Sequence, residues 1–196
     1  MSAQLFQIEK TSTASLENLL FAYGANMNPA QIRQRCSQPV RVAVACLQGY
    51  RIGFYGHSEI WDGAMETAIE AEGSQLWGTL YALSDSDWER LDQWQDARLD
   101  GAGQYFHYPV QVCDILGKCY DARLYKKDVL NELRLPSDLY MNLILEGARR
   151  NALPPAYIES LTTIKTAPTH YAVPLRPEID LTAAANDSCE SCNSIY

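Results

Sequence analysis

The sequence has few basic residues and no long apolar run. Its 16 Lys and Arg residues are outnumbered by 24 Asp and Glu residues, which gives a net charge of −8. Because nucleic-acid binding needs clustered Lys and Arg to neutralise phosphates, this balance argues against a nucleic-acid partner. No apolar run is long enough to cross a bilayer, and the start of the chain lacks the apolar segment of a signal peptide. We therefore expect no nucleic-acid or membrane partner and a cytoplasmic location.

Cysteine is sparse in this chain of 196 residues. The six cysteines are Cys36, Cys46, Cys113, Cys119, Cys189 and Cys192. The first four fall in strand-like or helical stretches, so we expect them to be reduced, small apolar residues of the core. The last two have the spacing of half a zinc site or a redox pair, but no second pair accompanies them. We therefore expect no metal site in this polar segment.

The standard signatures of nucleotide-binding and metal enzymes are absent as well. The sequence contains no P-loop, no dinucleotide fingerprint after a strand, no HExxH motif and no GxSxG motif. His57, His107 and His170 lie far apart in the chain, and each is more typical of a surface or core residue. The glycines at 101 and 103 are too close together for a phosphate loop and predict a mobile connection. A histidine-based metal site or catalytic triad therefore has little support.

What the sequence does contain is a series of short apolar runs separated by turn residues. In the first half these runs predict strands over 19–23, 40–47, 50–55, 65–71 and 75–83. The residues at 48–49 predict a tight hairpin between the second and third runs, and those at 72–74 a similar connection between the last two. A helix over 28–36 follows the first strand, with Asn28 as its cap and Pro29 at its first position.

The second half mixes helices with two further strands. Trp88, Leu91 and Trp94 fall on one face of a predicted helix over 84–95, which we interpret as core packing. Strands at 105–114 and 119–125 and helices at 138–152 and 156–164 follow. Antiparallel hairpins with helices between them predict an α+β fold, a small mixed β-barrel or curved sheet with flanking helices.

One domain accounts for most of the chain. With 196 residues, 47% of them hydrophobic, the chain can bury a full core without disulfides or a structural metal. No internal repeat and no long linker divides it. We therefore expect a polar leader over 1–18, one domain over 19–166 and a partly irregular C-terminal tail over 167–196.

The segment 21–27, FAYGANM, is the most informative part of the sequence. An apolar strand ends there in Gly24 and Asn26, residues that tolerate a positive φ and let successive backbone N–H groups point into one concavity. Such a nest binds an anion, typically a carboxylate. A Gly-x-Asn strand end is also an ordinary turn, so the motif needs support from elsewhere in the chain.

This segment resembles the FAYGSN signature of the γ-glutamylcyclotransferase-like (AIG2-like) superfamily, and later segments follow in the family's order. WDGA at 61–64 is similar to the family's glycine-containing strand start, and LWGTLYAL at 76–83 is similar to its WGxxW/Y strand. GQY at 103–105, followed by YPVQV at 108–112, resembles its GxYxxxxVxV strand. The stretch 136–157 resembles the C-terminal helix pair of the γ-glutamylcyclotransferase branch. The resemblance extends over about residues 19–165.

The resemblance implies a small mixed barrel that cyclises a γ-glutamyl amide. The α-amine of the substrate attacks the side-chain carbonyl, which gives 5-oxoproline and releases an amine or amino acid without a metal or organic cofactor. By the same resemblance, Tyr23, Gly24, Ala25 and Asn26 hold the glutamyl α-carboxylate through backbone N–H groups, and Tyr105 lines the pocket. The expected partner is a small-molecule γ-glutamyl substrate, and the expected assembly is a monomer or homodimer.

One position departs from the family pattern. The family's LDxxEG motif carries a Glu that takes a proton from the ammonium and delivers it to the leaving amine. Here the segment 91–96 reads LDQWQD, so Gln95 stands in place of that Glu. An amide does not titrate near neutral pH, so Gln95 can orient a substrate but cannot shuttle a proton, a role worth about 10²–10⁴ in rate.

Four interpretations of this departure stay open. In the first, Gln95 is an engineered substitution, and in the second it is natural in a non-catalytic relative. In the third, another carboxylate has taken over the role of the family's Glu. In the fourth, the alignment with the family motif is off by one residue and Asp96 is the acid. Glu66 is the strongest substitute, because it follows Gly63 on a strand where related sequences usually carry a small residue. A solvated strand position explains Glu66 about equally well. The catalytic candidates are therefore Gln95, Glu66 and Asp96.

Different classes of function follow from these alternatives. The first is a γ-glutamyl cyclotransferase, and the second is a disabled or repurposed family member that binds a γ-glutamyl or related carboxylate ligand. The segment 97–104 is longer than in the family, which favours a specialised γ-glutamyl amide, such as one that protects an amine in a biosynthetic pathway. A third, weaker hypothesis is an interaction protein that uses its tyrosine-rich surface and its tail.

Overall fold

The computed structural model describes residues 18–98 and 100–175. The expected leader and the Cys189–Cys192 pair lie outside the described residues. The elements, in chain order, are β1 (Leu19–Ala22), η1 (Ala25–Met27), α1 (Pro29–Arg35), β2 (Val40–Ser58), β3 (Gly63–Ala82), α2 (Asp85–Gln95), β4 (Phe106–Asp114), β5 (Cys119–Lys126), α3 (Asp138–Arg150) and α4 (Pro155–Thr162).

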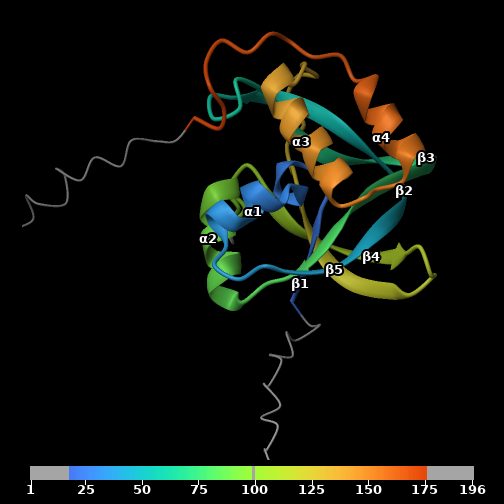
Figure 1. Cartoon of the computed structure of the whole chain (residues 1–196). Coiled ribbons are helices and arrows are strands. Elements are labelled where there is room, and N and C mark those ends of the chain that lie inside the picture. The colour runs from blue at the N-terminus through green and yellow to red at the C-terminus, as the bar shows by residue number, and fades with distance from the viewer. Residues whose placement is uncertain (1–17, 99, 176–196) are drawn as a thin grey trace, which may run out of the picture.

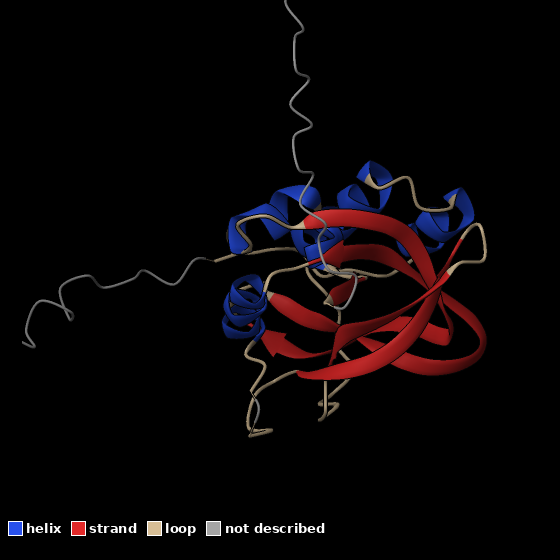
Figure 2. Cartoon of the chain, turned by 90° about the horizontal axis from the view of Figure 1, so that it is seen from below, coloured by secondary structure: helices blue, strands red, loops and turns tan. Residues whose placement is uncertain are grey.

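The five strands form a closed barrel in the order β1-β3-β2-β4-β5. Neighbouring strands are antiparallel except where β5 closes the barrel on β1, at the parallel pair Leu20 and Arg123. The helices gather on one side of the strands (Figures 1 and 2). The expected α+β fold, a small mixed barrel with flanking helices, is confirmed.

Local signals place the helix starts where the sequence predicts them. The Asn28 side chain accepts a 2.9 Å hydrogen bond from the Ala30 N–H and caps α1, and Pro29 occupies the first helical position. Ser137 caps α3 in the same way, by accepting from the Tyr140 N–H. Each cap supplies an acceptor for N–H groups that have no partner within the helix. Residues next to one another in the sequence therefore determine where each helix starts.

The two hairpins predicted at 48–49 and 72–74 are wrong. Residues 40–58 form one strand and residues 63–82 another, and the chain reverses direction between Ser58 and Gly63. The ladder continues across the expected turns, from the pair Gln48 and Gln75 to the pair Tyr50 and Glu70. The intervening residues bulge out of it, with positive φ at the glycines of both segments. Turn-type residues fit a β-bulge as well as a hairpin, and only strand pairing decides between them.

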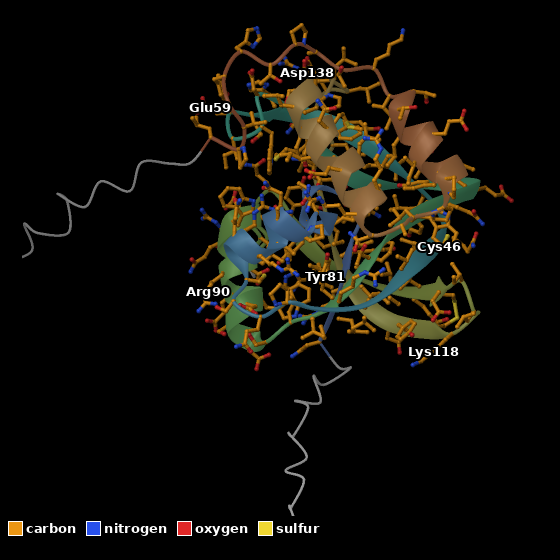
Figure 3. All side chains as sticks on the ribbon, viewed as in Figure 1. Cys46, Glu59, Tyr81, Arg90, Lys118 and Asp138 are labelled. Atoms are coloured by element: carbon orange, nitrogen blue, oxygen red, sulfur yellow. A yellow bond between two sulfur atoms is a disulfide. The ribbon has the colours of Figure 1, made fainter. Side chains whose placement is uncertain are left out.

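The expectation that four cysteines are reduced holds for two of them. Cys36 and Cys46 are free and buried, whereas Cys113 and Cys119 form a disulfide. These two residues are directly paired across the β4–β5 hairpin, with their Cα atoms 4.0 Å apart. Lys118, labelled in Figure 3, lies in the turn between them. The sequence separation does not reveal this register, which is why the bond was not expected.

The core has one part inside the barrel and another beneath the helices. Trp88 and Leu91 of α2 are buried in the second part, and Trp94 packs against it, which agrees with the predicted packing face. Gly147 brings α3 close to the chain that follows η1, because a Cβ there would lie 2.8 Å from the Asn28 nitrogen. Within the described residues, no helix has both the length and the apolarity that a membrane span requires.

Candidate active site

The loop that follows β1 forms one wall of the site. Tyr23, Gly24, Ala25 and Asn26 connect the end of β1 to η1, and Tyr23, Ala25 and Asn26 are buried. Gly24 has φ −108°, so the positive φ that we expected of this loop is not what requires glycine here. A Cβ at Gly24 would instead collide with the carboxyl group of Glu66. Glycine is required because the carboxyl group fills the space where any side chain would begin.

Glu66 lies on β3 and is buried, with 6% of its surface exposed. Its carboxylate accepts a hydrogen bond from the Tyr140 hydroxyl, and its backbone carbonyl accepts one of 2.6 Å from the Tyr105 hydroxyl. Burial raises the pKa of this carboxyl group, against the opposing effects of the Tyr140 hydrogen bond and the positive charges of Arg35 and Lys127. Glu66 is therefore not the solvated strand residue that was one of its two interpretations.

A cavity brings Gly24 and Glu66 together with Gln95. It encloses about 230 Å³ of space that no protein atom fills, including the part that opens to solvent. Its lining consists of residues from β1, the loop after it, β3, α2 and β5: Leu20, Phe21, Ala22, Tyr23, Gly24, Asn26, Glu66, Gln95 and Tyr125. Four segments that are distant in the sequence thus meet at one carboxyl group.

Gln95 reaches this cavity because α2 ends beside it. Gln95 is the last residue of the helix, and Asp92, one turn earlier, ties the helix to the barrel. The Asp92 carboxylate accepts a 2.5 Å hydrogen bond from the Tyr125 hydroxyl and lies 2.6 Å from Nε2 of His107. The register that places Gln95 at the site is therefore held by contacts of a side chain on the same helix.

Asp96 is not brought to the cavity. It follows α2 with φ 48°, and its carboxylate accepts hydrogen bonds from Arg98 Nε at 3.0 Å and from the Gln104 N–H at 3.3 Å. These contacts close the loop that follows α2 onto the end of the helix. Its neighbour Gln95 lines the cavity while Asp96 faces this loop.

Two tyrosines support the cavity from behind. Tyr105 is buried and holds the backbone of Glu66, but it is not part of the cavity wall. The Tyr23 hydroxyl donates a 2.5 Å hydrogen bond to the carbonyl oxygen of Tyr125 and so joins the loop after β1 to β5. Burial raises the pKa of both hydroxyl groups well above the usual value, so they stay protonated as donors at neutral pH.

Arg35 is a functional candidate that the sequence did not reveal. Its guanidinium group donates to Asn26 and, at 2.8 Å, to Gln31, and it lies 4.3 Å from the centre of the Trp94 ring. Burial lowers its pKa to about 10, which still leaves it charged at neutral pH. Arg35 therefore places a positive charge between the loop after β1 and the end of α2.

Tyr140 is a second functional candidate that the sequence did not reveal. It lies in the first turn of α3 and was predicted only as part of a helix, yet its hydroxyl donates to Glu66 and its ring stacks on Trp61, 4.3 Å between centroids. The partners of Tyr140 and Arg35 come from other elements of the fold. No short sequence motif contains Tyr140 or Arg35 together with these partners, so the sequence alone does not reveal the contacts.

The comparisons with known proteins agree with this architecture. The AIG2-like family model matches residues 75–161. The γ-glutamylcyclotransferases of Bos taurus and Homo sapiens are each 30% identical over 166 residues, which covers 83% of this chain and 85% of each relative. The chain belongs to the γ-glutamylcyclotransferase-like (AIG2-like) family.

Solved structures related to this AIG2-like chain share its fold. A structure of a γ-glutamyl cyclotransferase superposes with a TM-score of 0.73 at 29% identity, covering 80% of this chain and 92% of that one. YkqA from Bacillus subtilis, at 23% identity and a TM-score of 0.63, is similar in fold. The described residues of the AIG2-like chain contain no group of three His, Cys, Asp or Glu side chains placed to hold a metal ion.

Proposed function

We propose that this protein is a γ-glutamyl cyclotransferase that converts a γ-glutamyl amide into 5-oxoproline and a free amine or amino acid. The observation that carries the proposal is the buried Glu66 carboxyl group, which shares a cavity with Gly24 and Gln95. Cyclisation needs a group that removes a proton from the substrate ammonium, and Glu66 is the carboxyl group on the cavity wall.

The loop after β1 supplies the binding half of this proposal. Within the described residues, the backbone N–H groups of Gly24, Ala25 and Asn26 form no hydrogen bond, so they are free to donate to a ligand. The α-carboxylate of a γ-glutamyl group is an anion of the right kind for such donors. Arg35, bonded to Asn26, adds a positive charge behind the loop.

In this proposal Glu66 is the base of the cyclisation. With the α-carboxylate on the loop, the adjacent α-ammonium group lies near Glu66, whose ionised carboxylate takes one of its protons. The resulting amine attacks the γ-carbonyl carbon, and the tetrahedral intermediate collapses to 5-oxoproline with release of the protonated amine. A pKa raised by burial suits this role, because a base with a pKa nearer the working pH both accepts and returns a proton. Gln95 orients the substrate by hydrogen bonds.

The proposal is tested by incubating the protein with a panel of γ-glutamyl amines and γ-glutamyl amino acids and detecting 5-oxoproline by mass spectrometry. We expect turnover by the chain as it stands and a loss of about 10²–10⁴ in kcat/KM for Glu66→Gln, since an amide cannot take the proton. Asp96→Asn is the matched control, because its carboxylate faces the loop. Unchanged turnover in Glu66→Gln would remove Glu66 from the mechanism.

A second candidate function rests on Gln95, which occupies the cavity but cannot titrate. In this alternative, the protein binds a γ-glutamyl or related carboxylate ligand without turning it over. Calorimetric binding without 5-oxoproline formation, together with a gain of turnover in Gln95→Glu, is the result that would favour it over the first.

The panel also addresses the choice of leaving group. The loop 97–104 follows Asp96, the residue after Gln95, and Gly103 packs against the end of α2, because a Cβ there would collide with the Asp96 carbonyl. A loop in this position borders the side of the site from which the amine departs. We therefore expect γ-glutamyl amines to be turned over at least as well as γ-glutamyl amino acids.

A further inference from the structure

A buried lysine beside Glu66 has no role in the function proposed so far. Lys127 follows β5 and keeps only 5% of its surface exposed. Its backbone N–H donates a 3.0 Å hydrogen bond to the hydroxyl of Thr67, the residue after Glu66. Its ammonium group lies 5.0 Å from the centre of the Tyr105 ring, and the Tyr105 hydroxyl holds the Glu66 carbonyl. Lys127, Tyr105 and Glu66 are therefore one contiguous group.

The Lys127 ammonium group is not held by an oxygen atom of the described residues. In the described part of the chain it forms no hydrogen bond or ion pair, and its attraction to Glu66 acts over more than ion-pair distance. Burial lowers its pKa from the usual lysine value. Lys127 Nζ is not among the fully enclosed polar atoms of the described residues that lack a partner, so the tip of this otherwise buried side chain keeps some contact with solvent.

The neighbouring lysine shows the contrast. Lys126 lies 3.7 Å from the Glu70 carboxylate, with 20% of its side chain exposed, and its ammonium group is 4.2 Å from the centre of the Tyr108 ring. Successive residues of a strand point to opposite faces, so the two side chains leave the end of β5 in different directions, Lys126 toward Glu70 and Lys127 toward Tyr105. Two adjacent lysines thus differ in their surroundings and not in their chemistry.

The reaction needs proton transfers at two different nitrogens. The α-ammonium nitrogen loses one proton before it attacks and a second as it becomes the lactam N–H, and the departing nitrogen must gain one, because an alkyl amide nitrogen does not leave as an anion. Glu66, with a pKa raised by burial, is suited to the first transfer. A lysine ammonium group whose pKa is lowered gives up its proton more readily than an ordinary alkylammonium group, which suits the second.

We propose that Lys127 is the general acid that protonates the departing amine, while Glu66 is the base. This inference rests on the proposed cyclotransferase function. Glu66 takes a proton from the α-ammonium group, the amine forms the new C–N bond at the γ-carbon, and the old C–N bond breaks as Lys127 gives its proton to the departing nitrogen. The new ring nitrogen then gives its second proton to the neutral Lys127 amine, and the Glu66 carboxyl group gives its proton to the released amine, which departs as an ammonium ion, so both side chains return to their starting states. No other reactant is needed.

This role requires the tip of Lys127 to move. The ammonium group does not line the cavity and lies over Tyr105, so it has to swing toward the leaving nitrogen on its four-carbon stem. Such a stem has many rotamers, and the group has no hydrogen bond in the described residues that would have to break first. The 97–104 loop and Tyr105 adjoin the same region, where the departing amine is expected.

The test compares Lys127→Met and Lys127→Arg on two substrates with different leaving groups. We expect both variants to lose about 10²–10⁴ in kcat/KM with γ-glutamyl ethylamide, whose nitrogen must be protonated. Arginine keeps the charge but does not give up its proton near neutral pH. With γ-glutamyl p-nitroanilide, whose leaving nitrogen carries negative charge well, we expect the loss to shrink to about tenfold or less. Lys126→Met is the matched control and is expected to behave as wild type on both.

Each outcome has a definite meaning. Full activity of Lys127→Met on the ethylamide overturns the proposal, and so does full activity of Lys127→Arg, because charge alone would then suffice. Equal losses on both substrates, with an unfolding temperature close to that of wild type, assign Lys127 to substrate binding and also overturn it. If the wild-type chain forms no 5-oxoproline from either substrate or from the wider panel, it is the proposed function that has failed.

Discussion

Gly24 and Glu66 compete for the same small volume at the end of β1. The Glu66 carboxyl group occupies the space in which a Cβ at position 24 would lie, so neither residue can change without affecting the other. This pairing accounts for the glycine of the FAYGANM segment by space, because its φ of −108° is open to any residue. Two residues of the candidate site are thus coupled through packing before any chemistry is considered.

Gly24→Ala is expected to lower the free energy of unfolding by about 1–3 kcal/mol, the usual effect of an added methyl group in a filled site. Adding Glu66→Ala should recover most of that loss, because the second substitution vacates the space. Urea denaturation of the two single variants and the double variant gives the coupling energy. Strictly additive losses would contradict the shared volume.

Tyr140→Phe tests the charge state of Glu66. The Tyr140 hydroxyl stabilises the ionised carboxylate, so its removal raises the pKa of Glu66 further above the usual value. As a base, Glu66 must be ionised, and kcat/KM falls as the pH drops through its pKa. The acid limb of the pH profile is therefore expected to move to higher pH in the variant.

The other groups around Glu66 limit how this shift is interpreted. Arg35 of α1 and Lys127 after β5 lower the pKa of Glu66, and the hydroxyls of Tyr23 and Tyr105 stay protonated. These groups are unchanged in Tyr140→Phe, so the shift reports the missing hydrogen bond. Tyr81→Phe is a suitable control, because the Tyr81 hydroxyl donates to the Met27 carbonyl at 3.1 Å instead. If the acid limb of the pH profile does not move in Tyr140→Phe, the ionisation of Glu66 does not control kcat/KM.

At the scale of elements, the long β2–β3 pair decides the shape of the barrel. Its two strands run through glycine-containing bulges at 48–50 and 70–75, and the bulges allow the pair to bend without ending its ladder. The local residues are those of tight turns, which is why sequence reasoning divided each strand in two. Whether a turn-type segment reverses the chain or bulges out depends on the strand paired with it.

Gly49 is expected to be the most sensitive point of the first bulge. It has φ +75°, and a Cβ placed there meets no atom within 4 Å, so a substitution changes backbone strain alone. Gly49→Ala should lower the free energy of unfolding by about 1–2 kcal/mol, and Gly49→Asn by less, because asparagine tolerates this conformation. Urea denaturation measures both. Equal stability of wild type and Gly49→Ala would mean that residue 49 does not adopt a positive φ.

The β4–β5 hairpin shows the same limit of local information. Cys113 and Cys119 flank the turn between the strands predicted over 105–114 and 119–125, and these strands are confirmed as β4 and β5. The disulfide between them depends on register, since a shift of one residue would put the two side chains on opposite faces of the hairpin. The expectation that dispersed cysteines are reduced rested on composition alone. The pairing register of β4 and β5 instead places Cys113 opposite Cys119, where they form a disulfide.

At the scale of the whole molecule, closure of the barrel creates the candidate site. The parallel contact between β1 and β5 brings the end of β1 next to Tyr125, while α2 and α3 pack Gln95 and Tyr140 toward β3. An open sheet with the same strands would leave Glu66 in water and its pKa ordinary. The raised pKa is therefore a property of the closed fold and not of the strand that carries the residue.

The amino-acid sequence by itself determined the α+β class, the helix starts at Asn28 and Ser137 and the family resemblance. These depend on residues a few positions apart, whose propensities and caps act locally. Only the tertiary structure decided that Glu66 is buried against Gly24, that Tyr140, Arg35 and Lys127 surround it, and that Cys113 is bonded to Cys119. Such contacts join side chains by strand register, barrel closure and helix packing, and the free energy that selects them comes from burying the whole core at once.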